Sequence, residues 1–272
     1  GAGLARYDRS QLVLSTKVGY RLVPRSEAHP GNPLFAETPP LGTVFDFSRD
    51  AVLRSLEESL QRLRTDYVDI VLIHDPDESP RLGPGMDPYA TSHFEEVMAG
   101  AYPALAELRS QQVVRAIGLG MNQWQMLADF ARAGDFDCFL LAGRYTLLEQ
   151  ESVHELLPLC VQKNIRIILG GPYNSGILAS GAIPGAYYNY APATEEILAR
   201  VRRIEAVCRA QGVSLQAAAL QFPMGHPAVA SVIPGALSAA ELRANLDFFR
   251  EPIPAEFWQA LRDEQLLDPT AP

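Results

Sequence analysis

Short apolar runs alternate with longer amphipathic segments along most of this 272-residue chain. The short runs have the length of strands, and the longer segments carry apolar residues at helical spacing. This alternation predicts an α/β fold in which crossover helices join parallel strands. The predicted strands are residues 12–17, 67–74, 113–118, 136–142, 165–169 and 229–233. The predicted helices are residues 48–64, 94–111, 122–133, 152–163, 194–211, 238–249 and 254–267.

The number of predicted strands bears on the architecture. A TIM (β/α)8 barrel has eight parallel strands in about 250 residues, whereas six are recognised here. An open sheet of six parallel strands would leave long unpaired edges, which favour aggregation. We therefore expect a TIM barrel whose first two βα units are absent from this sequence. On this interpretation residues 1–272 form a single, N-terminally incomplete barrel domain.

Composition narrows the class of protein. The formal net charge of −9 argues against a general nucleic-acid or membrane-surface binder. The sequence contains no apolar run of about 18–20 residues, and nothing in it resembles a signal peptide. The three cysteines, Cys138, Cys160 and Cys208, lack CxxC spacing and are expected to be reduced packing residues. We therefore expect a cytoplasmic protein. The histidines outside the strand ends show no metal-ligand spacing, so no metal site is predicted; they are His29, His93, His154 and His226.

Two charged or polar side chains stand at the ends of predicted strands. Lys17 ends the first apolar run, and His74 ends the second. In a barrel of parallel strands, the carboxyl ends of the strands form the rim at which catalysis occurs. A cation beside a histidine suits proton transfer to a substrate oxygen. Lys17 and His74 are therefore the candidate catalytic residues.

Three long segments follow predicted strands at the same rim. Residues 19–47 and 75–92 are rich in proline and glycine, and residues 170–192 carry several tyrosines among glycines. Segments of this length in a compact domain usually cover a ligand or are disordered. The acidic cluster at the start of the second segment is expected to be a solvated loop rather than a cation site; its members are Asp75, Asp77 and Glu78.

Four segments occur in the order and spacing of the aldo-keto reductases, and the sequence resembles this family over nearly its whole length. They are Leu14-Ser15-Thr16-Lys17-Val18-Gly19, Asp69-Ile70-Val71-Leu72-Ile73-His74, Ile117-Gly118-Leu119-Gly120-Met121-Asn122 and Ile233-Pro234-Gly235-Ala236. The resemblance implies a TIM barrel that holds an extended nicotinamide cofactor across its C-terminal face.

The resemblance also assigns catalytic roles. Enzymes of the family use a tyrosine as proton donor or acceptor, together with a lysine, a histidine and an aspartate. Lys17 matches the lysine, whose charge lowers the pKa of the tyrosine, and His74 matches the histidine, which orients the substrate oxygen. The tyrosine and aspartate have no match in this sequence. Tyr7 and Tyr20 lie near Lys17 but do not follow the family's pattern, so neither is expected to substitute.

For the nicotinamide end of the cofactor, the resemblance points to residues after two of the strands. Asn122 matches the family residue that holds the carboxamide of the nicotinamide, although Met121 replaces the usual serine before it. Gly170 and Gly171 stand in the segment in which the family often stacks a tyrosine on the nicotinamide. These three residues, Asn122, Gly170 and Gly171, are the candidates at this end.

At the phosphate end, the sequence after the last strand predicts a helix that begins after a glycine turn. Backbone N–H groups at such a helix start bind phosphate groups. NADP-preferring relatives carry a lysine and an arginine where this chain has Gly235 and Glu241. A carboxylate would repel a 2′-phosphate and accept a hydrogen bond from a ribose hydroxyl, which favours NAD, while Arg243 keeps NADP open as the alternative. The candidate residues here are Pro234, Gly235, Glu241 and Asn245, the last matching an adenine contact.

The function implied is that of an NAD(P)-dependent oxidoreductase with a small-molecule substrate. It would transfer a hydride between nicotinamide and a sugar or cyclic hemiacetal hydroxyl, oxidising an aldose or pyridoxal to a lactone, or act on a small carbonyl. The alternative is a non-catalytic, cofactor-binding or interaction subunit built on a degenerate barrel. Cofactor binding would not separate these two hypotheses, whereas turnover would.

Overall fold

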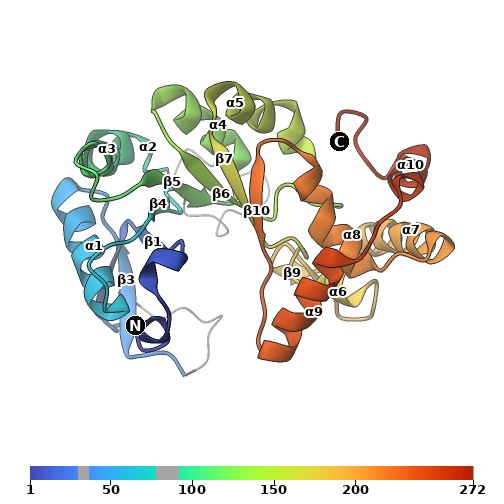
Figure 1. Cartoon of the computed structure of the whole chain (residues 1–272), viewed down its shortest axis with the longest axis horizontal. Coiled ribbons are helices and arrows are strands. Elements are labelled where there is room, and N and C mark those ends of the chain that lie inside the picture. Colours follow the sequence, from blue (N-terminus) through green and yellow to red (C-terminus); the bar gives the residue numbers. More distant parts are fainter. Residues whose placement is uncertain (30–36, 78–91, 272) are drawn as a thin grey trace. The chain divides into compact units, whose positions relative to one another are not determined.

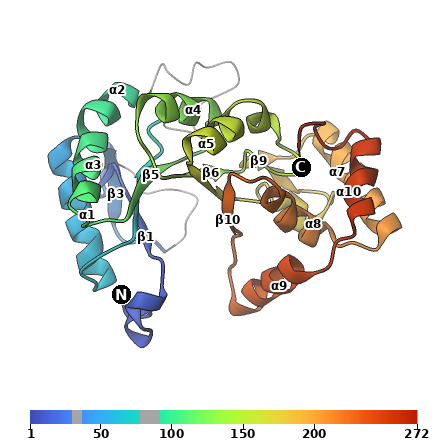
Figure 2. The same cartoon turned by 45° about the horizontal axis from the view of Figure 1, so that its top comes forward.

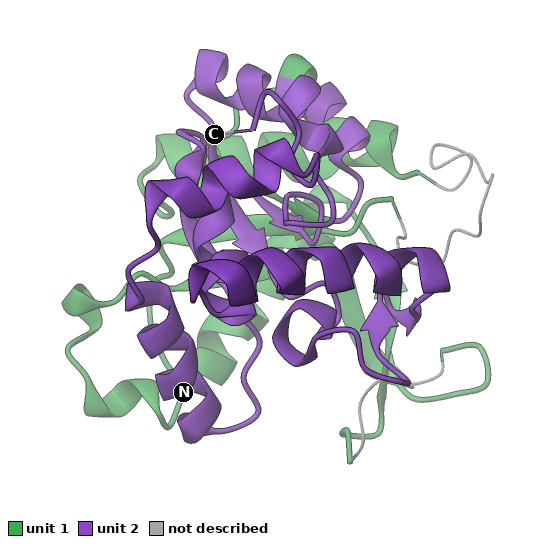
Figure 3. Ribbon diagram, turned by 90° about the vertical axis from the view of Figure 1, so that its right-hand side faces the viewer, with its two compact units in different colours: residues 1–121, 132–138 green, residues 122–131, 139–272 purple. Residues whose placement is uncertain are grey.

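The computed structural model describes residues 1–29, 37–77 and 92–271. The chain divides into two compact units, which Figure 3 shows in different colours. Unit 1 comprises Gly1–Met121 and Arg132–Cys138, and unit 2 comprises Asn122–Ala131 and Phe139–Pro272. The single barrel domain over residues 1–272 stays a prediction.

Unit 1 contains three parallel strands in the order β1 (Ser15–Val18), β4 (Ile70–His74) and β5 (Ala116–Met121). Lys17 pairs with Leu72, and His74 pairs with Gly120. Residues that pair across a parallel sheet point to the same face, as do residues two apart in one strand. Lys17, Leu72 and His74 therefore share one face of the sheet.

A β-hairpin follows β1 in unit 1. Its strands are β2 (Tyr20–Pro24) and β3 (Leu41–Phe45), which pair antiparallel with Tyr20 opposite Phe45. Gly19, between β1 and β2, has φ of +108°, and a Cβ atom there would collide with the ring of Phe47. The turn into the hairpin therefore requires glycine at this position.

The helices of unit 1 cover the strands. α1 (Arg49–Leu63) begins at Ser48, whose side chain accepts a hydrogen bond from the amide of Ala51, and it packs on β1 (Figure 1). The predicted helix 94–111 is three successive elements in the structure. They are α2 (Phe94–Glu96), a π-helical turn (Val97–Ala101) and α3 (Tyr102–Ser110). Two short 3-10 turns, Leu4–Arg6 and Arg9–Gln11, precede β1.

A buried carboxylate fixes the start of β4 in unit 1. Asp69 is 2% exposed, and its Oδ2 accepts hydrogen bonds from the amide of Leu14 at 2.8 Å and from Nη2 of Arg9 at 2.7 Å. Arg115 lies 3.1 Å from Oδ1. The carboxylate thus joins the segment before β1 to β4 and β5, which helps to set the register on which the placement of Lys17 and His74 depends.

Unit 2 contains the strands β6 (Cys138–Ala142), β7 (Arg166–Gly170) and β10 (Val229–Ile233), in that order, with β7 and β10 parallel. A small hairpin, β8 (Tyr187–Tyr188) and β9 (Ala191–Pro192), follows β7. In Figure 2, α10 lies beside α7, and α8 and α9 are also in contact. The helices are α4 (Trp124–Ala133), α5 (Leu156–Lys163), α6 (Ile177–Ser180), α7 (Glu195–Gln211), α8 (Leu215–Gln221), α9 (Ala239–Arg250) and α10 (Ala255–Asp263). The first residue of β6 and the last two of α4 belong to unit 1.

All six predicted strands are present, with ends that differ from the prediction by at most a few residues. Both hairpins lie in segments that were predicted to be loops, and α8 was not predicted at all. Cys138, Cys160 and Cys208 are buried and unpaired, as predicted. Most of the predicted loop 75–92 falls on residues 78–91, outside the described residues. No helix in the described part of the chain has the length and apolarity needed to cross a membrane.

Candidate functional site

The first cluster of candidate residues lies in unit 1, at the carboxyl ends of β1 and β4. Lys17 and His74 are both half-buried, and the sheet register directs them to one face. Burial lowers the pKa of Lys17, while the nearby charge of Asp75 acts in the opposite direction. Burial, and then the charge of Lys17, lowers the pKa of His74 to about 3. The imidazole is therefore neutral at pH 7 and can serve as a hydrogen-bond donor or acceptor.

Asp75 and Asp77 do not form the solvated acidic loop that the sequence predicted. Asp77 is fully buried, and the side chain of Asp75 is only 21% exposed. Oδ2 of Asp75 lies 3.4 Å from Nε2 of His74. The prediction was wrong because it rested on local charge, whereas the turn after β4 buries Asp77 and most of the Asp75 side chain. Glu78 lies outside the described residues.

Tyr20 joins this cluster from the hairpin. Its phenol donates a hydrogen bond to the Asp75 carboxylate, and its ring lies 4.6 Å from the His74 ring between centroids. Phe45 packs edge-on against Tyr20 at 4.8 Å. Tyr7, the other tyrosine near Lys17 in the sequence, is 68% exposed. Unit 1 therefore gathers a lysine, a histidine, a tyrosine and a carboxylate, of which the sequence predicted only Lys17 and His74 as site residues.

The second cluster lines a cavity of about 500 Å³ in unit 2, a volume suited to a small-molecule ligand. Five of the predicted cofactor residues lie on its wall, namely Asn122, Gly171, Gly235, Glu241 and Asn245. Gly170 ends β7 and is not on the wall. Pro234 lines a separate cavity beside α9. The structure therefore brings most, but not all, of the predicted set together.

Hydrogen bonds fix the amide side chains on this wall. Nδ2 of Asn122 donates to the carbonyl oxygen of Ala142 at 2.9 Å, which ties it to the end of β6. Asn245 accepts from the phenol of Tyr173 at 2.8 Å and donates from Nδ2 to the carbonyl oxygen of Gly235 at 3.3 Å. Burial raises the pKa of Tyr173 to about 12, so it keeps its proton at neutral pH. Both asparagines are thus held in defined orientations.

Two side chains cap the start of α9 at one side of the cavity. The Ser238 hydroxyl accepts from the amide of Glu241 at 3.2 Å, and Oε2 of Glu241 accepts from the amide of Leu237 at 2.7 Å. Glu241 therefore stabilises the helix start and also lines the cavity. Arg243, by contrast, is exposed and is not among the residues that line the cavity.

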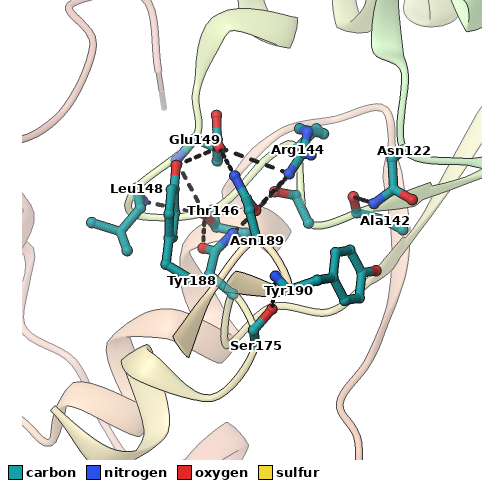
Figure 4. A network of polar contacts seen from close by, with 12 residues as sticks. Asn122, Ala142, Arg144, Thr146, Leu148, Glu149, Ser175, Tyr188, Asn189 and Tyr190 are labelled. Atoms are coloured by element: carbon teal, nitrogen blue, oxygen red, sulfur yellow. Dashed lines mark hydrogen bonds and ion pairs between the residues drawn. The ribbon is translucent and has the colours of Figure 1, made fainter. Parts of the chain in front are cut away.

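Arg144 is the one cationic side chain among the described residues of this wall. Its Nη1 donates to Oδ1 of Asn189 at 2.7 Å and lies 3.8 Å from Oε1 of Glu149 (Figure 4). Nδ2 of Asn189 donates in turn to Oε1 of Glu149 at 2.7 Å, and the phenol of Tyr188 donates to the same oxygen. The network holds the arginine between the end of β6 and the β8–β9 hairpin.

A second set of contacts attaches this hairpin to the segment after β7. The amide of Tyr190 donates to the hydroxyl of Ser175 at 2.9 Å (Figure 4). The hydroxyl of Thr146 donates to Oδ1 of Asn174, whose Nδ2 donates to the carbonyl oxygen of Gly143 at 3.1 Å.

Four residues of the cavity wall were not predicted as site residues from the sequence, namely Arg144, Tyr173, Asn174 and Asn189. The position of Arg144, two residues past the end of a predicted strand, is the one signal that could have found it.

The residues on the wall of this cavity have the chemistry that binding of a dinucleotide requires. Gly176 and Gly235 lie on the wall, and a Cβ atom at either position would meet no atom within 4 Å, so the backbone there is open to a ligand. Amide side chains, one cation and two tyrosines line the same space. Asn122, Arg144, Tyr173 and Asn245 could therefore hold a cofactor. Within residues 1–29, 37–77 and 92–271, no group of three His, Cys, Asp or Glu side chains is arranged to hold a metal ion.

Comparisons with known proteins agree with this chemistry. The sequence model of the "Aldo/keto reductase family" matches residues 1–264. Pyridoxal 4-dehydrogenase of Microbacterium luteolum is 37% identical over 278 residues, which cover 97% of this chain and 79% of that protein. D-threo-aldose 1-dehydrogenase of a Pseudomonas species is 34% identical over 272 residues, covering 98% and 79% of the two chains.

Solved structures extend the comparison to the fold. The holo form of an aldo-keto reductase from Bacillus halodurans matches with a TM-score of 0.69 at 21% identity, covering 97% of this chain and 75% of that one. A glycerol dehydrogenase from Gluconobacter oxydans matches with a TM-score of 0.66 at 17% identity, covering 98% and 78%. These similarities confirm the predicted fold class, an α/β barrel of the TIM type.

Proposed function

Because the chain belongs to the aldo/keto reductase family of oxidoreductases, we propose that it is an NAD-dependent dehydrogenase of sugars or sugar-like cyclic hemiacetals. Its reaction is the oxidation of the hydroxyl on the hemiacetal carbon to a lactone. The observation that carries the proposal is the pairing of a lysine with a neutral histidine on one face of unit 1, at the ends of β1 and β4. A nicotinamide cofactor, when bound, accepts the hydride.

The residues of unit 1 handle the substrate oxygen and its proton. Neutral His74 orients the hydroxyl through a hydrogen bond, and it does not compete for the proton because its pKa lies near 3. The ammonium group of Lys17 stabilises the negative charge that develops on the substrate oxygen as the hydroxyl proton passes to water. Half-burial strengthens this effect, since water screens the charge less than at an exposed site.

The cavity of unit 2 supplies the residues for the cofactor. Asn122 offers its carboxamide to the nicotinamide amide, and Asn245 offers the same group to the adenine. Arg144 supplies positive charge for the phosphates, and Asn189 and Glu149 hold its Nη1 group in place. Glu241, which stands where NADP-preferring relatives carry an arginine, lines the cavity, while Arg243 does not. This charge distribution supports NAD over NADP.

The relatives support the substrate class. One is named a pyridoxal 4-dehydrogenase and another a D-threo-aldose 1-dehydrogenase, and each is more than 30% identical over nearly all of this chain. Pyridoxal in its cyclic form and an aldose in its ring form share a hemiacetal hydroxyl. We therefore assign the hemiacetal, rather than an open-chain carbonyl, as the group that reacts.

The test is a turnover assay on the purified chain. NAD or NADP is supplied with D-threo-aldoses or with pyridoxal, and the absorbance of the reduced nicotinamide is followed over time. The expected result is reduction of NAD by at least one of these substrates, and slower reduction of NADP. Binding of NADH without turnover of either substrate class would instead identify a non-catalytic, cofactor-binding subunit.

A further inference from the structure

Asp75 occupies an unusual backbone position at the edge of the candidate active site. It directly follows His74, at the end of β4, and its φ of 39° lies in the left-handed region. A residue other than glycine is uncommon in this conformation. The amide of Asp75 donates to the carbonyl oxygen of Gly120 at 2.9 Å, and this bond holds the backbone there. In this conformation Oδ2 of Asp75 lies 3.4 Å from Nε2 of His74.

Groups from three elements face the Asp75 carboxylate. Lys17 of β1 supplies positive charge, Tyr20 of β2 donates a hydrogen bond, and Nε2 of His74 lies 3.4 Å away. Asp77, from the same turn, adds negative charge. Burial, together with Asp77, raises the pKa of Asp75 to about 7, although Lys17 and the Tyr20 hydrogen bond act in the opposite direction.

A purely structural role would not require a carboxylate here. An asparagine could accept the same hydrogen bond from Tyr20 without the cost of burying a charge. The side chain is also 21% exposed, next to the two candidate catalytic residues, so a small molecule can reach it. A carboxylate has about four acceptor positions, and the phenol of Tyr20 occupies one of them. Acceptor capacity therefore remains on the carboxylate.

We propose that Asp75 is a substrate-specificity residue that accepts a hydrogen bond from a hydroxyl group next to the reacting carbon. The partner is a neutral O–H donor on a polyhydroxylated ring, the kind of group that a carboxylate binds well at close range. Tyr20 is the positioning residue, since it fixes the carboxylate through its phenol and packs on His74 with its ring. The proposal rests on the proposed function, because it presumes a hydroxylated substrate at Lys17 and His74.

The energetic consequence is discrimination between substrates. A site that is built to bind a hydroxyl group rejects an analogue without it, because the buried acceptor is then left unpaired. An aldose should therefore be preferred over its 2-deoxy analogue. The preference should increase as the pH rises through about 7, where Asp75 loses its proton and becomes an acceptor on both oxygens.

The experiment compares kcat/KM for an aldose and for its 2-deoxy analogue in four proteins. These are the wild type, Asp75→Asn, Tyr20→Phe and the control Asp66→Asn, which removes an exposed carboxylate of the same unit. The wild type and the control should prefer the aldose by about tenfold or more. In Asp75→Asn the ratio should fall severalfold and lose its pH dependence, through a lower kcat/KM for the aldose alone, because the amide oxygen is a weaker acceptor than a carboxylate and does not titrate. Tyr20→Phe should give an intermediate ratio.

The outcomes separate the two proposals. An equal loss of kcat/KM for both substrates in Asp75→Asn, with an unchanged ratio, would overturn the role of Asp75 and leave the dehydrogenase function intact. A wild-type protein that oxidises no aldose and no pyridoxal would overturn the dehydrogenase function, and the role of Asp75 with it. Circular dichroism of each variant verifies folding, and Tyr20→Phe provides a milder change of the same contact should Asp75→Asn fail to fold.

Discussion

The phenol of Tyr173 donates a hydrogen bond to Oδ1 of Asn245 at 2.8 Å and so joins the segment after β7 to α9 within unit 2. Both residues line the candidate cofactor cavity, and Asn245 is only 9% exposed. The Nδ2 group of the same asparagine donates to the carbonyl oxygen of Gly235. Each polar atom of the Asn245 amide is therefore oriented before any ligand binds, and binding need not include the entropic cost of ordering it.

Replacement of Tyr173 by phenylalanine should weaken NADH binding. The variant removes the hydrogen bond to Asn245 and keeps the ring, so the loss corresponds to one neutral hydrogen bond of about 1 kcal/mol, or roughly fivefold in Kd. Titration of NADH fluorescence measures the change. Tyr187→Phe is the matched control, because Tyr187 is 52% exposed and does not line the cavity. Equal Kd values for the two variants would show that the Tyr173–Asn245 bond does not orient a cofactor contact.

Removal of the Glu241 charge should shift cofactor preference toward NADP. Glu241→Gln keeps an oxygen that can accept from the amide of Leu237, so the contacts that cap α9 survive while the negative charge is lost. One charge near a 2′-phosphate at the protein surface contributes on the order of 1 kcal/mol, and we expect the ratio of the Kd values for NADPH and NADH to fall by about 3–10-fold. Glu256→Gln, a first-turn glutamate of α10, should leave this ratio unchanged. A ratio that also stays constant in Glu241→Gln would remove the basis for preferring NAD.

The sequence predicted the strands and main helices well, because their signal is local. The run that ends at His74 is nearly all apolar, as expected of a strand buried on both faces, and residues 49–63 carry a clear helical stripe with Ser48 as the cap. The positions of Lys17 and His74 at the ends of two parallel strands were then enough to predict that they lie at the same rim of the sheet. Resemblance to the family added Asn122, Glu241 and Asn245, which the structure places on one cavity wall.

The remaining site residues could not be predicted, because their positions depend on contacts that are distant in sequence. Tyr20 reaches His74 only because β2 turns back at Gly19 and pairs with β3, and the proline-rich and glycine-rich composition of that segment hides the hairpin. Arg144 is placed by Asn189, which is 45 residues away. Asp75 looked like a member of a solvated acidic run, and only its burial beside Lys17 shows otherwise.

Loss of the Lys17 charge should remove most of the catalytic activity. Lys17→Met keeps the apolar stem of the side chain but leaves the developing negative charge on oxygen without its cation, and we expect kcat to fall by about 10²–10⁴-fold. Binding of NADH should be unaffected, since Lys17 does not line the cavity of unit 2. Lys163→Met is the control, because Lys163 is the one other lysine in the chain and lies in unit 2. Near-normal turnover of Lys17→Met would remove Lys17 from the catalytic site.

The pKa of Lys17 itself provides a test that does not depend on turnover. Burial lowers this pKa, so acylation of Lys17 by a small anhydride should reach half its maximal rate below the ordinary lysine value of about 10.4. Mass spectrometry of the labelled peptide gives the rate at each pH. The charge of Asp75 acts to raise the pKa of Lys17, and Asp75→Asn should therefore move the midpoint still lower. A midpoint that moves upward in this variant would show that the two side chains do not interact as the structure indicates.

The buried Asp69 carboxylate should make the protein sensitive to acid. Burial alone would raise its pKa, but the hydrogen bond from the Leu14 amide and the hydrogen bond and charge of Arg9 outweigh burial and lower it. A carboxyl whose pKa is lower in the folded state stabilises the fold above its unfolded pKa of about 3.9. That stabilisation is lost as the pH falls through the lower, folded value. Asp69→Asn should thus reduce the free energy of unfolding by about 2–4 kcal/mol at pH 7.

Urea unfolding of Asp69→Asn and the wild type at pH 7, and again below the folded pKa of Asp69, tests this dependence on pH. The difference between the two proteins should be largest at pH 7 and should shrink in acid, because the wild type also loses the charge there. Asp135→Asn is the control: Asp135 pairs with Arg109 but is 85% exposed, so its loss should change stability by less than about 1 kcal/mol. A difference for Asp69→Asn that is the same at both pH values would mean that packing around Asp69, and not its charge, joins the segment before β1 to β4.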